Sequence, residues 1–445
     1  MIVKQFEYKP LSHFSYALLC GNEVALVDPE RDPSMYYKFA EENNAKIVAV
    51  FETHPHADFV SSHLQIHKQT GAILYTSKLV DADYPHTPFD ANDLLQIGNV
   101  NFSALNTPGH SPDSITIVAK SENKVALFTG DTLFIGDVGR PDLREKSGNQ
   151  KSKRLDLAKA MYNTIQTQFT NFNDDAIVYP AHGAGSLCGK NMSSEGSSTL
   201  GEQRETNWAF KTQSQDAFVN HLLDSQPFIP HYFGFNVDLN KAGAENLNTS
   251  ISNKDVKLQD EELESKELII DTRNEEIFKK GHKSNSINIM ALEEGHKFET
   301  WLGSIVKPEE PFSLVATSFN HAKELLSRVS KIGYENQLKS IFTLGDTTWN
   351  KLDKIDLQDF KSNKSDYTIV DIRNQSETNE GTFFENAITI PLHELRERAT
   401  EIPTDKPIVV HCAGGYRSAA GSSIVARELN QVAVYDLGEA INQFK

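Results

Sequence analysis

Short apolar runs alternate with turn residues through the first half of the chain. They lie at Val24–Val27, Ile47–Val50, Ala72–Tyr75, Ser114–Val118 and Val125–Phe128. Runs of this length predict strands, and several are too continuously apolar for a sheet with one face in water. A few helical stretches lie between them. Residues 1–240 are therefore predicted to form an α/β sandwich whose sheets are covered by helices.

A polar segment separates this block from the rest of the chain. Residues 241–261 are rich in Asn, Ser and acidic side chains. Such composition is typical of a connector rather than a packed element. We expect a linker here, with some ordered pieces.

The remainder of the chain repeats itself at a spacing of about 100 residues. Leu-Ile-Ile-Asp271-Thr-Arg273 matches Thr-Ile-Val-Asp371-Ile-Arg373, and a glycine follows at the same offset in each copy. A self-match of this period indicates a duplicated domain, and strand–helix alternation within each copy predicts a small doubly wound α/β domain. The two copies are expected at residues 262–355 and 356–445.

Bulk properties narrow the class of protein. A chain of 445 residues is expected to fold as two or three domains. The net charge of −17 argues against nucleic acid or an anionic membrane as a partner, because both select clustered Lys and Arg. The three cysteines are far apart and make a poor disulfide framework. With no signal-peptide pattern and no long apolar span, we expect a soluble cytoplasmic protein.

Side chains of metal-ligand type follow the predicted strands of the first block. They are His54, His56, Asp58, His110, Asp131 and His182. The first three share one loop, and alone that loop is also explained as a polar turn with incidental histidines. Imidazoles and carboxylates at alternate positions of a loop would converge on one ion. Because the other three also come at strand ends, the pattern predicts a metal site.

The order His-x-His-x-Asp, His, Asp, His resembles the metallo-β-lactamase superfamily. Within it, the stretch Gly-Asp131-Thr-Leu-Phe-Ile-Gly-Asp-Val-Gly-Arg140-Pro-Asp-Leu is similar to the persulfide dioxygenases. The resemblance covers essentially all of the first block and implies an αββα sandwich. It also implies one Fe(II) per chain, held by His54, His110 and Asp131. Such a 2-His-1-carboxylate face leaves positions open for O₂ and a sulfur ligand.

The same resemblance implies that the remaining ligand-type residues line the site or act as occasional ligands. They are His56, Asp58 and His182. Phe59 is a departure from two-metal hydrolases such as glyoxalase II, which have a histidine directly after the aspartate. Phenylalanine cannot coordinate, so a second metal would rest on Asp58, Asp131 and His182. This weakens the alternative interpretation, a zinc-dependent thioester hydrolase of the glyoxalase II type.

Three further residues are candidates for substrate binding. Arg140 would meet an anionic part of the substrate, or would pair with Asp137 or Asp142 as a structural clamp. Cys188 and Lys190 lie a few residues after His182. A free cysteine is more often a small buried apolar residue than a reactive thiol, so a sulfur-accepting role for Cys188 is the lesser alternative.

A second candidate site lies near the C-terminus, where an apolar strand ends at Cys412. The loop residues that follow are Ala413, Gly414, Gly415, Tyr416 and Ser418, with Arg417 among them. Glycines let such a loop turn its N–H groups inward, and the next helix adds positive potential at its N-terminus. This arrangement stabilises a thiolate or an anionic persulfide. Arg417 would add charge or hold the loop through Asp371.

The segment Cys-Ala-Gly-Gly-Tyr-Arg-Ser resembles the active loop of rhodaneses, over about residues 360–445. With four residues between Cys412 and Arg417, it is shorter than a phosphatase cradle, which has five. The first copy reads Thr317-Ser-Phe-Asn-His-Ala-Lys at this place, without Cys or a glycine pair. Residues 262–355 are therefore expected to be an inactive rhodanese-like domain with a structural or docking role.

The combined resemblance is to bacterial persulfide dioxygenase–sulfurtransferases. It implies oxidation of a low-molecular-weight thiol persulfide by O₂ to sulfite and thiol, with thiosulfate formed through Cys412, in sulfide detoxification. The expected partners are the persulfide, O₂ and sulfite, and a homo-oligomer is expected. A non-enzymatic alternative is a persulfide carrier or sensor that uses Cys412 alone.

Overall fold

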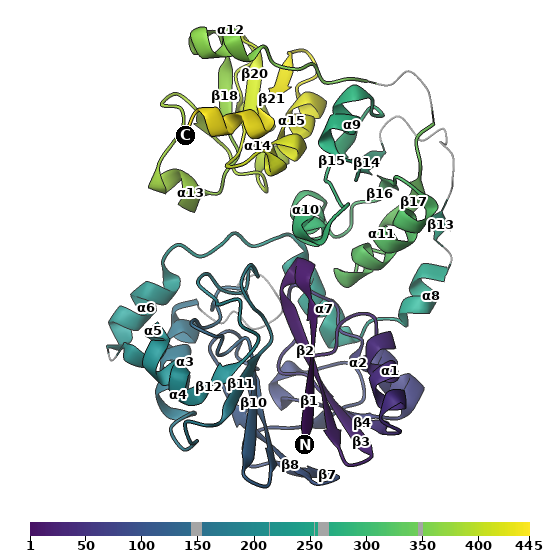
Figure 1. Ribbon diagram of the computed structural model, residues 1–445, viewed down its shortest axis with the longest axis vertical. Helices are drawn as coiled ribbons and strands as arrows, with labels where there is room; N and C mark the ends of the chain where they lie inside the picture. The colour runs from purple at the N-terminus through teal and green to yellow at the C-terminus, as the bar shows by residue number, and fades with distance from the viewer. Residues whose placement is uncertain (144–153, 213, 253, 257–266, 346–349) are drawn as a thin grey trace. The chain divides into compact units, whose positions relative to one another are not determined.

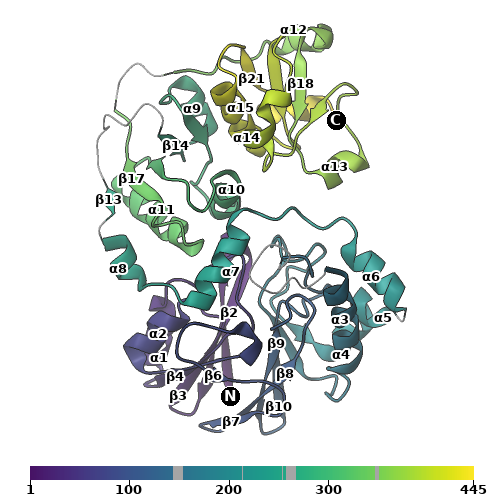
Figure 2. The same cartoon turned by 180° about the vertical axis from the view of Figure 1, so that it is seen from behind.

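The computed structural model describes residues 1–143, 154–212, 214–252, 254–256, 267–345 and 350–445. Two compact units divide the chain, one of residues 1–250 with 330–333 and one of residues 251–329 with 334–445. Figures 1 and 2 show the elements of both from opposite sides.

Two six-stranded sheets form the centre of the first unit, counted over its described residues. The first contains, in spatial order, β1 (Ile2–Tyr8), β2 (His13–Cys20), β3 (Glu23–Val27), β4 (Lys46–Phe51), β5 (Ile73–Thr76) and β6 (Thr87–Pro88). The second contains β12 (Ser198–Thr199), β11 (Ile177–Pro180), β10 (Lys124–Gly130), β9 (Ile115–Ser121), β8 (Val100–Asn106) and β7 (Leu94–Ile97). All five predicted strands of this block are confirmed, as β3, β4, β5, β9 and β10.

Side-chain alternation along β3 shows how the layers are built. Val24 and Leu26 pack against α1 (Ser34–Glu42) and α2 (His63–Thr70), whereas Ala25 and Val27 pack against the second sheet. On the second sheet, Leu127 faces α3 (Arg154–Thr167) and α6 (Gln215–Leu223). Both faces of each sheet are therefore buried, which explains the continuous apolar runs. The predicted αββα sandwich is confirmed (Figure 1).

The remaining helices of the first unit follow β12. They are α4 (Leu200–Thr206), α5 (Trp208–Lys211), α7 (Tyr232–Ala242) and α8 (Leu247–Ser252). The expected linker, residues 241–261, therefore contains the end of α7, the helix α8 and the short strand β13 (Asp255–Val256). Its residues 253 and 257–261 lie outside the described part of the chain.

Two parallel sheets form the second unit. The first lobe, residues 267–329 and 334–345 with β13, has the strand order β13-β17-β16-β14-β15. The second lobe, residues 350–445, has the order β19-β18-β20-β21. The first-lobe strands are β14 (Leu268–Asp271), β15 (Ser286–Asn288), β16 (Phe312–Val315) and β17 (Leu338–Phe342). The second-lobe strands are β18 (Thr368–Asp371), β19 (Ile388–Thr389), β20 (Ile408–His411) and β21 (Val434–Asp436).

Helices connect these parallel strands. The first lobe has α9 (Glu275–Lys280), α10 (Phe298–Ile305) and α11 (Phe319–Lys331), and the second has α12 (Leu357–Ser362), α13 (Gln375–Glu380), α14 (Leu395–Arg398) and α15 (Tyr416–Glu428). In the second lobe, Val409 packs on one face of the sheet with Phe360 of α12. The next residue, Val410, points to the other face, where α15 lies so close that a Cβ placed on Gly421 would be 3.1 Å from the Val410 side chain. Helices therefore cover both faces of this sheet, as a doubly wound arrangement requires.

Candidate metal centre and thiol loop

Three of the predicted ligands meet at one point in the first unit. His54 follows β4, His110 precedes β9 and Asp131 follows β10, and their ligand atoms lie within 4.8 Å of one another. Asp131 Oδ2 lies 3.8 Å from His54 Nε2 and 3.5 Å from His110 Nε2. All three side chains are buried. The sandwich thus brings together the residues that the family resemblance assigns to iron.

A glycine makes this convergence possible. Gly130 has φ of 52°, and a Cβ at this position would lie 2.5 Å from Thr53 Oγ1. Only glycine tolerates both the left-handed backbone and the close approach of the two loops. Asp131 and His54 can therefore project from neighbouring loops into one site.

Hydrogen bonds on the far side of each imidazole orient it. His110 Nδ1 lies 2.9 Å from the carbonyl oxygen of Arg140, and because a carbonyl only accepts, Nδ1 carries the proton. His54 Nδ1 lies 3.0 Å from Thr53 Oγ1. Metal-binding histidines are commonly held in this way through the other ring nitrogen. The Nε2 atoms are left to face Asp131.

These residues fit a metal ion. Asp131 Oδ2 is buried and accepts no hydrogen bond from the described residues, although it is surrounded by imidazoles. Ligand atoms about 2.0–2.2 Å from a common ion lie roughly 3 Å apart, and the observed separations need only a small contraction to reach this. Two imidazole nitrogens and one carboxylate oxygen form a set that suits Fe(II) and also zinc.

A second group of buried ligand atoms adjoins the first. Asp58, His182 and Cys188 lie within 4.8 Å of one another. His182 Nδ1 is 2.7 Å from Asp131 Oδ1, and its Nε2 is 2.7 Å from Asp58 Oδ2. Burial by itself would lower the pKa of His182, but these two carboxylates raise it well above its usual range. Burial, together with Asp131 and Asp58, raises the pKa of the Cys188 thiol.

This grouping changes one expectation from the sequence. Under the alternative hydrolase interpretation a second metal would rest on Asp58, Asp131 and His182, and the structure places Cys188 with Asp58 and His182. Sequence reasoning considered Cys188 only as a sulfur acceptor or core residue. Its distance along the chain from Asp58 concealed the contact.

His56 lies with other residues. A ring nitrogen of His56 lies within 4.8 Å of carboxylate oxygens of Asp28 and Glu52. The distance from His56 Nε2 to Asp28 Oδ1 is 3.2 Å. Phe59 is buried against it, with ring centroids 4.4 Å apart, so the departure from the hydrolase pattern places an apolar ring beside the site.

Sequence reasoning missed His13 in this region. It is buried at the start of β2, its ring centroid is 3.8 Å from that of Phe59, and its backbone forms a bridge with His182. Burial, followed by the charges of His182 and His56, lowers the pKa of His13. A single histidine in an apolar strand carries no pattern that would have revealed it.

Two of the substrate-binding candidates are engaged with protein atoms. The buried Arg140 guanidinium donates to both carboxylate oxygens of Asp142, at 2.6 and 2.7 Å, which is the structural clamp named as an alternative. Lys190 Nζ donates to the carbonyl oxygens of His221 and Asp224, at 2.7 and 2.8 Å.

The thiol loop in the second lobe connects β20 to α15. Cys412 is buried, and the Gly415 N–H donates to its Sγ at 3.2 Å. Gly415 has φ of 105°, and a Cβ there would lie 2.7 Å from the backbone of Glu439. The Ser418 hydroxyl donates to the Gly415 carbonyl at 2.8 Å, which fixes the turn into α15. The backbone is thus shaped around the sulfur atom.

Of the two roles considered for Arg417, the one through Asp371 is wrong. Arg417 donates to both carboxylate oxygens of Glu377, each at 2.6 Å, and Asp371 is bound instead by Arg373. Glu377 belongs to the capping box of α13 with Asn374, so the helix end presents it to the loop. The partner was not visible in the sequence because it lies 40 residues away.

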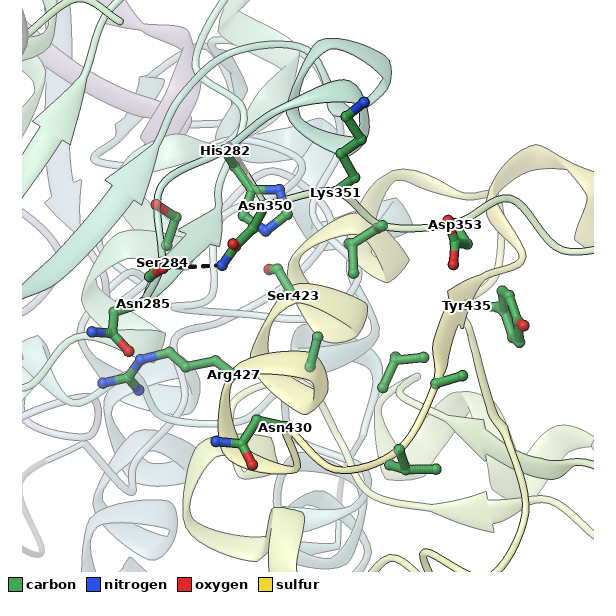
Figure 3. Close-up of a pocket in the computed structure, with 16 residues that line it drawn as sticks. His282, Ser284, Asn285, Asn350, Lys351, Asp353, Ser423, Arg427, Asn430 and Tyr435 are labelled. Atoms are coloured by element: carbon green, nitrogen blue, oxygen red, sulfur yellow. Dashed lines mark hydrogen bonds between the residues drawn. The ribbon is translucent and has the colours of Figure 1, made fainter. Parts of the chain in front are cut away.

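A cavity of about 470 Å³ lies in the second unit (Figure 3). His282 and residues 284–286 line it from the first lobe, and residues 350–353 together with α15, β21 and the loop between them line it from the second. Asn350 donates to Ser284 Oγ across one wall at 3.0 Å. Neither Cys412 nor Arg417 contributes to its lining.

Among the helices that the structure describes, none is both long and apolar enough to cross a bilayer.

Two family models match separate parts of the chain. The model of the metallo-beta-lactamase superfamily matches residues 8–182, and that of the rhodanese-like domain matches residues 356–443. A probable hydroxyacylglutathione hydrolase of Schizosaccharomyces pombe is 29% identical over 175 residues, covering 38% of this chain and 63% of that protein. The chain thus spans less than two thirds of that relative's length. The hydroxyacylglutathione hydrolase GloC of Haemophilus influenzae is 27% identical, over 38% of this chain and 83% of that protein.

A solved structure covers more of the chain. A metallo-beta-lactamase from Staphylococcus aureus subsp. aureus COL superposes with a TM-score of 0.68 at 28% identity, over 77% of this chain and 98% of that chain. Because it covers more than the sandwich, the likeness extends into the second unit. The chain therefore contains a metallo-β-lactamase superfamily domain and, C-terminal to it, a rhodanese-like domain.

Proposed function

We propose that the protein is an iron-dependent persulfide dioxygenase coupled to rhodanese sulfur transfer. The observation that carries the proposal is the buried convergence of His54, His110 and Asp131 in one chain with the loop around Cys412. The first is a facial set of two imidazoles and one carboxylate, and the second cradles a sulfur atom. The overall reaction is R-SSH + O₂ + H₂O → R-SH + H₂SO₃.

Fe(II) bound by His54, His110 and Asp131 would supply O₂ activation and a position for the persulfide sulfur. The protein residues hold this set in place. His182 binds one oxygen of Asp131, so the other oxygen is directed towards His54 and His110. Burial of all these side chains keeps bulk water from the reacting atoms.

Cys412 would carry the sulfane sulfur in the second lobe. The outer sulfur of its persulfide would be transferred to sulfite, Cys-S-S⁻ + SO₃²⁻ → Cys-S⁻ + S₂O₃²⁻, so one S–S bond breaks as another forms. The inward N–H of Gly415 and the N-terminus of α15 favour the anionic sulfur. This step consumes the sulfite that the metal centre would produce.

A second candidate function is a zinc-dependent thioester hydrolase of the glyoxalase II type. Two observations favour it: the hydroxyacylglutathione hydrolases among the relatives, and the adjoining group of Asp58, His182 and Cys188, which would hold a second ion. The buried ring of Phe59 stands against it, because hydrolytic members place a ligand at that position.

The deciding experiment is O₂ consumption by the anaerobically purified, iron-loaded full chain after addition of glutathione persulfide. We expect rapid uptake with formation of sulfite and thiosulfate. His110→Ala should abolish uptake and lower the iron content, whereas His86→Ala, a half-buried histidine bonded to the Tyr84 carbonyl, should change neither. Cys412→Ser should keep O₂ uptake and lose thiosulfate.

The rivals predict different results. Hydrolysis of S-lactoylglutathione by the zinc-loaded protein, without O₂ uptake by the iron-loaded protein, would replace the dioxygenase with the hydrolase. Full persulfide handling by His110→Ala would favour a carrier or sensor that uses Cys412 alone.

A further inference from the structure

Asp28 stands behind the metal centre, one residue after β3. Its Oδ1 accepts the backbone N–H of Thr53 at 2.8 Å, and its Oδ2 accepts the Thr53 hydroxyl, also at 2.8 Å. Thr53 Oγ1 in turn lies 3.0 Å from Nδ1 of His54. All three residues are buried. The contacts form an unbroken chain from a carboxylate to a candidate ligand.

Counting protons fixes the direction of this chain. A threonine hydroxyl has one proton, and a carboxylate can only accept. If that proton goes to Asp28, Thr53 Oγ1 must accept from His54, so Nδ1 of His54 carries the ring proton. The lone pair is then on Nε2, the atom that lies 3.8 Å from Asp131 Oδ2.

We infer that Asp28 is a positioning residue that acts through Thr53 to hold His54 in the tautomer able to bind a metal through Nε2. The inference rests on the metal centre of the proposed function and adds to it the residue that prepares His54. His110 reaches the same tautomer by a different route, since its Nδ1 donates to a backbone carbonyl that no side-chain substitution removes. Of the two imidazoles, His54 is therefore the one whose ring proton is set by side chains that can be mutated.

Asp28 also lies close to Glu52 and His56, and this group could be considered as a separate cation site. Both Asp28 oxygens, however, already accept hydrogen bonds from Thr53. A cation would compete with these contacts, so the geometry is better explained by a carboxylate that holds Thr53 and lies beside His56, whose Nε2 is 3.2 Å from Asp28 Oδ1.

Asp28→Asn tests the direction of the chain with almost no change in shape. The amide oxygen is expected to keep the bond from the Thr53 N–H, which turns the NH₂ group towards Thr53 Oγ1. The hydroxyl must then donate to His54, which moves the ring proton to Nε2 and blocks the metal. We expect the Kd for Zn²⁺, measured by chelator competition on the full chain, to rise by about 10- to 100-fold or more.

Three variants make the test specific. Thr53→Val removes the hydroxyl without forcing either tautomer and should weaken Zn²⁺ binding less than Asp28→Asn, whereas Thr53→Ser should restore it. Asp90→Asn is the matched control, because buried Asp90 also accepts from a hydroxyl, Ser77, and from a backbone N–H, Lys78, but has no histidine behind it. It should leave the Kd unchanged.

A second measurement separates this inference from the proposed function. In the metal-free protein, ¹⁵N chemical shifts of labelled histidines report the tautomer, and His54 should change from Nδ1–H to Nε2–H in Asp28→Asn. An unchanged tautomer, or a loss of affinity in Thr53→Val at least as large as in Asp28→Asn, would overturn the inference. Absence of O₂ uptake with a normal tautomer shift would overturn only the dioxygenase.

Discussion

The two lobes of the second unit share a frame and differ in one loop. Asp271 and Arg273 in the first lobe pair at 2.7 Å, and Arg273 also donates to the Gly281 carbonyl at 2.8 Å. In the second lobe, Asp371 and Arg373 pair at 2.7 Å, and Arg373 donates to the Gly381 carbonyl at 2.9 Å. The strand order β15-β14-β16-β17 likewise matches β19-β18-β20-β21.

The two lobes differ in the loop that follows the central strand, β16 in the first and β20 in the second. Asp271 pairs with Val315 and Asp371 pairs with His411, so Ala316 occupies the place of Cys412. Residues 316–318 connect strand to helix in the first lobe, one fewer than residues 412–415 in the second. The ion pair is therefore common to both lobes, whereas Cys412 and the extra loop residue occur in the second lobe alone.

The largest expected effect comes from replacing Cys412. Cys412→Ser should reduce thiosulfate formation from sulfite and persulfide by at least about 10³-fold, since the proposed sulfur transfer proceeds through this thiol. Ala316→Cys, made in the Cys412→Ser background, should not restore activity, because the shorter loop lacks the glycine turn. Recovered sulfur transfer would contradict the importance of the loop and leave only the thiol as the difference.

A smaller effect is expected from removing the Asp–Arg ion pair that the two lobes share. Asp371→Asn and Asp271→Asn each remove the charge from a fully buried carboxylate bonded to arginine. Breaking such a pair costs about 3–5 kcal/mol, because the partner is left buried and uncompensated. Hydrogen exchange of β18 amides should accelerate by ~100-fold or more in the first variant and that of β14 amides in the second.

Each variant serves as the control for the other. If Asp271→Asn also speeds exchange in β18, the lobes unfold as one cooperative unit. If neither variant changes exchange in its own lobe, the ion pair does not maintain the frame.

Local patterns in the sequence predicted more of this molecule than pairwise contacts did. The five strands of the sandwich, the repeat and the loop after Cys412 were all recognisable because each depends on neighbouring residues. The contacts of Cys188 with Asp58, of Arg417 with Glu377 and of Thr53 with Asp28 were not, because they join segments 25 or more residues apart. The folded sheets, rather than any motif, bring those residues together.

The smallest expected effect concerns Glu377. Its ion pair with Arg417 is not part of the Asp–Arg motif that the two lobes share. Burial would raise the pKa of Glu377, but its hydrogen bonds with Arg417, aided by the nearby Arg373, hold it below the usual value. A lowered folded pKa stabilises the fold above the unfolded pKa, and that stability is lost as pH falls through the folded value. Because the carboxylate is about one-third exposed, the contribution should not exceed about 1 kcal/mol.

Glu377→Gln should therefore lower the stability of the second lobe slightly at neutral pH, and the difference from the wild type should vanish at a pH below the folded pKa. Hydrogen exchange of α15 amides at neutral and acidic pH measures this difference. The free Arg417 should also loosen the thiol loop, so sulfur transfer should fall by a few fold, far less than in Cys412→Ser. A loss as large as that of Cys412→Ser would mean that the Arg417–Glu377 pair takes part in the chemistry itself rather than in holding the loop.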